Sequence, residues 1–243
     1  MISKNAISTL RQKRLRILYL IFLFMMPTSN YIWAANTTMQ EAISRLSADD
    51  CLTREAGAKG LIESADIDTT IAINILIKSL TDEINKPFVG HTASGSYLPA
   101  HEHLLTNYCS ALKKLLVENT QMLQNLIDSS AGQLKDRLMI IAFSLGDTSK
   151  HAKVLNMFSG SSNNYLRLAA IRALFDYGDI ADIPIFKATL SDTFSILYKG
   201  DMTPREGELM YPIRQIAAGS LGKLGFTIRR NGKEYIIVRE PEK

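Results

Sequence analysis

Three segments of the chain resemble one another, and this self-similarity restricts the fold more than any other feature of the sequence. Residues 54–63 read REAGAKGLIE, residues 167–178 read RLAAIRALFDYG, and residues 214–225 read RQIAAGSLGKLG. Each segment begins with arginine, continues with small residues at helical spacing, and has leucine at its eighth position. Repeats of this kind predict helical units that stack and bury one another's apolar faces.

Apolar residues recur at helical spacing from residue 38 to residue 224, which predicts a helical chain nearly throughout. After a lead-in helix, 38–46, we expect four hairpins and a last helix, 211–224. The hairpins pair helices 53–63 with 68–80, 104–118 with 120–127, 133–145 with 150–158 and 165–177 with 180–190. Asp66 or Asp68 is the expected N-cap of helix 68–80, and Gly178 and Gly225 are expected helix stops.

The end of the chain changes from helical to strand-like patterning. Two β-prone runs, 226–230 and 233–238, are separated by Asn231-Gly232. An Asn-Gly pair between such runs is a strong hairpin signal, because both residues accept the positive φ that a tight turn requires. Since an isolated hairpin is only marginally stable in water, we expect 226–238 to pack on the last helix.

The repeated segments also resemble a known family. The stretch YLRLAAIRALFDYGDIADIPIFKATLSD (165–192) is similar to the short HEAT repeats of many bacterial proteins, and PIRQIAAGSLGKLG (212–225) resembles their first helix. Residues 53–80 and 136–158 match more weakly, and 82–128 departs from the repeat period. The resemblance implies an all-α protein, a right-handed α-solenoid of about four hairpins with a small C-terminal β-hairpin. The alternative is an irregular helical bundle.

The resemblance also implies a function and a domain organisation. HEAT-type repeats usually serve as scaffolds for protein–protein interaction, without enzymatic activity or cofactor. We therefore expect a helical-repeat domain over 36–225, a C-terminal hairpin and tail over 226–243, and a protein partner. No catalytic residue is assigned, because neither a nucleophile motif nor a phosphate-binding glycine motif occurs.

The first 35 residues have the pattern of a secretory signal peptide. A basic stretch, Arg11–Arg16, precedes the apolar run Ile17–Met26, and the small residues Ala34 and Ala35 follow. The apolar run is much shorter than the about 20 residues that span a bilayer. We expect 1–35 to be cleaved and the protein to be periplasmic or secreted, with no membrane span after cleavage. The alternative is an uncleaved N-terminal anchor.

The net charge of +4 is misleading about partners. Five of the 28 basic side chains lie in 1–35, which contains no acid, so 23 remain against 24 acidic side chains. Proteins that bind nucleic acid usually carry a basic surface on the folded domain. The sequence therefore argues against a nucleic-acid partner.

Two long connections interrupt the predicted helices, at 81–103 and 191–210. Loops of this length are uncommon inside compact domains and are often functional. Each follows the second helix of a hairpin, so in a solenoid both lie along one rim. Their aromatic and basic side chains are the predicted partner-binding residues, namely Phe88, Tyr97, Phe194, Tyr198 and Arg205. The alternative is a pair of solvated insertions.

Histidines are concentrated in the first connection. His91, His101 and His103 have side chains suited to Zn²⁺ or Cu²⁺. They support an alternative function, a metal-binding or hydrolytic accessory protein that uses loop 82–103. Cys51 and Cys109 could pair in an oxidising compartment or remain as two small buried thiols.

Arginine recurs at one position of the repeated segments, as Arg54, Arg167 and Arg214. The three side chains form either a row that binds acidic ligands or a set of structural contacts between repeats.

Overall fold

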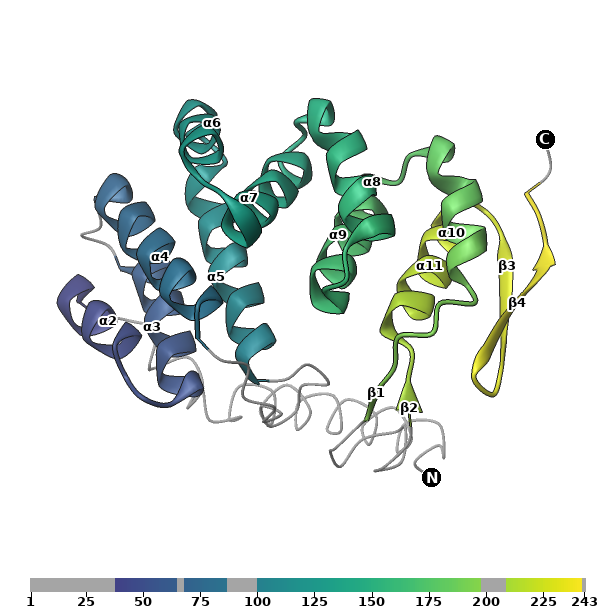
Figure 1. Ribbon diagram of the computed structural model, residues 1–243, viewed down its shortest axis with the longest axis horizontal. Coiled ribbons are helices and arrows are strands. Elements are labelled where there is room, and N and C mark those ends of the chain that lie inside the picture. Colours follow the sequence, from purple (N-terminus) through teal and green to yellow (C-terminus); the bar gives the residue numbers. More distant parts are fainter. Residues whose placement is uncertain (1–37, 65–67, 87–99, 198–208, 242–243) are drawn as a thin grey trace, which may run out of the picture. The chain divides into compact units, whose positions relative to one another are not determined.

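The computed structural model describes residues 38–64, 68–86, 100–197 and 209–241 (Figure 1). The described part contains ten α-helices and two short antiparallel strand pairs. The predicted signal peptide, 1–35, lies outside the described residues. No helix in the described ranges is both long and apolar enough to cross a bilayer.

The predicted helices are all confirmed, with ends that shift by a few residues. They are α2 Met39–Leu46, α3 Cys51–Glu63, α4 Thr69–Ile84, α5 Ala100–Leu116, α6 Thr120–Ser129, α7 Gly132–Ser144, α8 His151–Gly160, α9 Asn164–Tyr177, α10 Ile183–Thr189 and α11 Pro212–Lys223. One 3₁₀ turn, Thr148–Lys150, precedes α8, and another, Ile180–Asp182, precedes α10.

Local chemistry explains where several of these helices begin and end. The carboxylate of Asp68 accepts the backbone N–H groups of Thr70 and Ile71, so Asp68 is the N-cap of α4. Gly178 ends α9 with φ of 72°, a left-handed conformation that favours glycine.

The odd-numbered helices contact one another in chain order: α3 contacts α5, α5 contacts α7, α7 contacts α9, and α9 contacts α11. Each even-numbered helix packs more extensively on the odd helix that follows it than on the one before (Figure 1). The hairpins expected from the sequence are therefore wrong by one helix, because they paired each even-numbered helix with the odd-numbered helix before it. The main pairs are α2–α3, α4–α5, α6–α7, α8–α9 and α10–α11.

This error has a physical cause. The predicted pairs were helices joined by short connections. A short connection between two helices does not require a large contact between them. The two long connections instead join helices that pack closely, α4 with α5 and α10 with α11.

Buried apolar side chains form two clusters, and α7 contributes to both. Leu138 and Ile141 belong to the first cluster, which includes residues from α2 to α7. Ile140 and Phe143 belong to the second, which continues through the later helices to Phe226. Because α7 buries residues on both sides, its hydrophobic surface is not confined to one narrow stripe.

The C-terminal β-hairpin is confirmed. Strand β3, Thr227–Asn231, pairs with β4, Glu234–Arg239, and β3 contacts α11. Asn231 pairs with Glu234, so the two-residue connection is Gly232-Lys233, one residue later than expected. Gly232 is the first residue of this turn and adopts a positive φ of 59°.

The long connections are shorter and more ordered at their ends than the sequence indicated. Helix α4 continues to Ile84 and α5 already begins at Ala100. In the second connection, β1 (Ile196–Leu197) pairs with β2 (Leu209–Met210), a strand pair that the sequence analysis missed. Residues 87–99 and 198–208 lie outside the described part. The expectation that the two connections share one rim depends on these residues, so it stays a prediction.

Candidate binding groove

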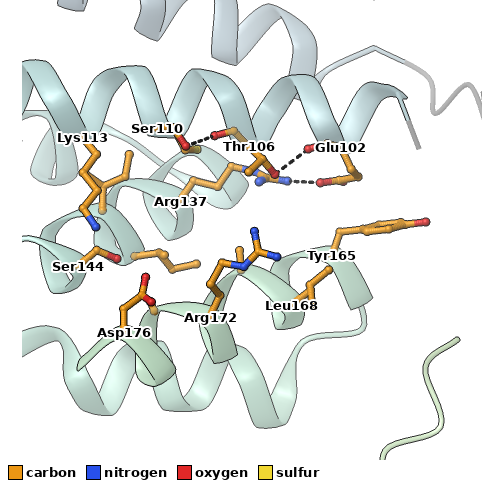
Figure 2. A pocket seen from close by; sticks show the side chains of 15 residues that line it. Glu102, Thr106, Ser110, Lys113, Arg137, Ser144, Tyr165, Leu168, Arg172 and Asp176 are labelled. Carbon is orange, nitrogen blue, oxygen red and sulfur yellow. Dashed lines mark hydrogen bonds and ion pairs between the residues drawn. The ribbon is translucent and has the colours of Figure 1, made fainter. Parts of the chain in front are cut away.

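A pocket of about 170 Å³ lies across three successive odd-numbered helices, and we call it the groove (Figure 2). Helix α5 contributes Glu102, Thr106, Cys109, Ser110 and Lys113; α7 contributes Arg137, Ile140, Ile141 and Ser144; α9 contributes Tyr165, Leu168, Ala169, Arg172, Ala173 and Asp176. On each helix these residues are separated mainly by three or four positions, the spacing that places side chains on one face.

A buried ion pair closes one side of the groove. Nη2 of Arg137 on α7 lies 3.0 Å from Oε2 of Glu102 on α5, and the two side chains are only 3% and 7% exposed. Nε of Arg137 is buried without a hydrogen-bond partner within the described residues. A buried donor without an acceptor is destabilising. One N–H of the Arg137 guanidinium therefore has no acceptor among the described residues, although the charge is paired with Glu102.

The small polar side chains of α5 are turned back onto their own helix. Thr106 Oγ1 donates to the carbonyl oxygen of Glu102 at 2.8 Å, and Ser110 Oγ donates to that of Thr106 at 2.9 Å. Burial raises the pKa of the Cys109 thiol, and the nearby Arg137 only partly opposes this. Cys109 is therefore a neutral thiol in the wall of the groove.

Basic side chains outnumber acidic ones in the groove. Lys113, Arg137 and Arg172 are cationic, whereas Glu102 and Asp176 are anionic. Figure 2 shows Lys113 and Arg172 directed into the space between α5 and α9. Lys113 is half-buried and has no ion-pair partner among the described residues.

Apolar and small side chains form the rest of the lining. Ile140, Ile141 and Leu168 provide apolar walls, and Ala169 and Ala173 leave room above α9. Such a site combines hydrophobic contact with positive charge. It is chemically suited to a small apolar group that carries a negative charge.

The predicted partner-binding residues do not line the groove where the structure describes them. Phe194 is half-buried, and its ring packs edge-on against Tyr165 with centroids 5.5 Å apart. The backbone N–H of Phe194 donates to Oδ1 of Asp192. Phe194 thus packs against the second core cluster from the connection that follows α10. The other predicted residues, Phe88, Tyr97, Tyr198 and Arg205, lie outside the described part.

The two described histidines of the predicted metal site contact carboxylates of different helices. His101 Nδ1 lies 3.1 Å from Oε1 of Glu83 on α4, and His103 Nε2 lies 3.3 Å from Oε2 of Glu55 on α3. Both histidines belong to α5, where residues two positions apart point in nearly opposite directions. His91 lies outside the described residues. Within them, no group of three or more metal-ligating side chains occurs.

Cys51 and Cys109 are both free thiols in the structure. Cys51 Sγ accepts a hydrogen bond from Arg54 Nη2 at 3.3 Å, whereas Cys109 lines the groove.

The recurring arginines make structural contacts between helices. Arg54 Nη2 donates to Glu83 at 3.1 Å, and Arg167 Nη2 forms an ion pair with Asp192. Arg214 Nε donates to the carbonyl oxygen of Asp192 at 2.5 Å. These partners are acids and backbone carbonyls near helix ends, as expected for structural contacts between repeats.

Sequence reasoning missed the cations of the groove. The spacing of 102, 106, 109, 110 and 113 could have shown one polar face on α5. It could not show that Arg137 and Arg172 lie opposite this face, because that depends on how α5, α7 and α9 pack.

No model of a known protein family matches the chain, and no curated protein sequence matches it. Evidence about function therefore comes from the groove and from the sequence pattern.

Proposed function

We propose that this protein is an exported helical-repeat scaffold of the HEAT type that binds a protein partner in the cell envelope. The observation that carries the proposal is the groove, because equivalent faces of three successive odd-numbered helices line it. Stacked repeats commonly bind partners along a surface to which several repeats contribute. The order of contacts from α3 to α11 supports an α-solenoid, here with five helix pairs, and the resemblance to HEAT repeats implies that it is right-handed.

The leader supports an envelope location. Its order of basic, apolar and small residues is that of a secretory signal. A fusion of residues 1–35 to alkaline phosphatase, which is active only after export, tests this point. We expect active enzyme in the periplasmic fraction. Active enzyme that stays in the membrane fraction, with residues 1–35 still attached, would instead indicate an uncleaved anchor.

The charge balance supports a protein partner rather than a nucleic acid. Residues 36–243 carry one more acidic than basic side chain. The groove is mainly apolar with a few charged groups, and protein-binding sites usually combine these features.

Site-specific photo-crosslinking in the native cell tests the proposal. Benzoylphenylalanine replaces Tyr165, which lines the groove, and in a matched control it replaces Tyr177 on the same helix, which is 45% exposed and outside the groove lining. We expect a discrete crosslinked protein from position 165 and none from position 177. Equal crosslinking from both positions, or none from position 165, would contradict a groove-bound partner.

A further inference from the structure

We propose that the groove binds the C-terminal residue of an extended peptide, with the terminal carboxylate held by its cations and an apolar side chain held by its walls. This inference rests on the proposed function, because it specifies which part of a protein partner enters the groove. Three features carry it: the size of the groove, the cations Lys113 and Arg137 in its lining, and the closeness of its apolar and cationic groups.

The size of the groove suits a small part of a ligand rather than a large molecule. Its volume of about 170 Å³ is below the about 300–1,000 Å³ of pockets that hold drug-sized ligands. One branched side chain with a carboxylate is smaller than such ligands and suits a pocket of this size.

The charges of the groove select an anion. Arg137 is held in place by Glu102, and its Nε has no acceptor. Lys113 is half-buried on the same face of α5, with no acid paired to it in the described ranges. A carboxylate brought to this side of the groove would meet the ammonium of Lys113 and the N–H of Arg137 that has no acceptor among the described residues.

The arrangement favours a chain end over an internal acidic residue. Lys113 and Arg172 line the same small pocket as Ile140, Ile141 and Leu168, so the anionic and apolar groups of the ligand must be close together. A C-terminal leucine, isoleucine, valine or phenylalanine carries both on one α-carbon. An internal aspartate or glutamate needs a second residue for the apolar walls and room for the chain on both sides.

Paired peptide libraries test the inference on the mature chain, residues 36–243. The two libraries have identical random sequences ending in leucine, isoleucine, valine or phenylalanine, one with a free C-terminal carboxylate and one amidated. Peptides retained by the protein are identified, and their dissociation constants are measured by fluorescence polarisation. We expect the acid form to bind at least tenfold more tightly than the amide, and the difference to shrink as salt is added.

Lys113→Gln and Lys114→Gln are matched variants for the same measurement. Each removes one positive charge from α5, but only Lys113 lines the groove. We expect Lys113→Gln to weaken the acid peptides about tenfold and Lys114→Gln to leave them nearly unchanged. Since Lys113 has no ion pair in the described part of the chain, its loss should not prevent folding, and circular dichroism checks this.

The possible outcomes separate the two proposals. Acid and amide peptides that bind equally well, with Lys113→Gln matching Lys114→Gln, would overturn the carboxylate site but leave a protein-binding groove. If neither library binds and position 165 gives no crosslinked protein, both proposals fail. Preference for the acid form together with a specific effect of Lys113→Gln supports both.

Discussion

Oε1 of Glu83, near the end of α4, lies 3.1 Å from Nη2 of Arg54 on α3, and both side chains are almost fully buried. The same oxygen lies 3.1 Å from Nδ1 of His101 at the start of α5, and Oε2 lies 2.9 Å from Nζ of Lys86. One carboxylate therefore connects three successive helices at the base of the first long connection.

A similar arrangement occurs at the base of the second long connection. Arg167 near the start of α9 forms an ion pair with Asp192, just after α10, and Arg214 near the start of α11 binds the carbonyl oxygen of Asp192. Arg54 and Arg167 occupy the first position of the repeated sequence segments. The recurring arginines Arg54, Arg167 and Arg214 thus position helix ends and do not line the groove.

Glu83→Gln should lower the free energy of unfolding by about 3 kcal/mol, because it leaves Arg54 buried without its counter-ion. The matched control is Asp82→Asn on the same helix. Its ion pair with Lys78 is exposed, so we expect a change within about 0.5 kcal/mol. Urea unfolding followed by circular dichroism measures both. Equal effects of the two substitutions would show that the buried ion pair contributes no more than the exposed one.

The contribution of Glu83 should also depend on pH. Burial acts to raise its pKa, but hydrogen bonds from His101 and Lys86 and the charge of Arg54 lower it from 4.5 to about 2. A carboxylate with a lowered folded-state pKa stabilises the fold fully above its unfolded pKa. This stabilisation is lost as pH falls from about 4.5 towards 2.

Unfolding of the wild type and of Glu83→Gln at a series of pH values measures this dependence. We expect the stability difference between them to be constant above pH 5 and to shrink at lower pH, because glutamine does not titrate. A difference that stays the same down to the lowest pH at which both proteins fold would contradict the lowered pKa.

Gly57 allows α2 and α3 to approach closely, and alanine there should be destabilising. A Cβ at this position would lie 2.8 Å from the backbone N of Leu46 and 2.9 Å from the carbonyl oxygen of Ala42. Because these are backbone atoms, α2 must move, and we expect a loss of about 1–3 kcal/mol. Gly222→Ala in α11 is the control, since a Cβ there has open space.

Alanine at Gly222 should raise the free energy of unfolding by about 0.5–1 kcal/mol, because alanine is the better helix former. Thermal and urea unfolding of the two variants should therefore change in opposite directions. Destabilisation of similar size in both would mean that the close contact at Gly57 has no special cost.

The sequence predicted what is local in this fold and missed what depends on packing. Helix α4 and its cap at Asp68 could be found because the 3.6-residue period and the capping side chain are both local. The hairpin was found for the same reason, although pairing of Asn231 with Glu234 moved its turn by one residue. Which face of α5 meets α7, and therefore the contact of Glu102 with Arg137, is set by packing between helices that are distant in sequence.

Asp192→Asn provides a test of how far the two ends of the helical array are coupled. It removes the ion pair with Arg167 while its remaining amide oxygen can still accept the N–H of Phe194, so we expect a loss of about 1–3 kcal/mol. Among the described residues, Asp192 and Glu83 share no hydrogen-bond or ion-pair partner, and Phe194 beside Asp192 packs against the second core cluster. In a stack where each unit contacts only its neighbours, the two losses should add within about 0.5 kcal/mol in the double variant. Urea unfolding of both single variants and the double variant, followed by circular dichroism, measures the interaction free energy.

An interaction free energy above about 1 kcal/mol would mean that strain at one junction reaches the other through α7, the helix that contributes to both clusters.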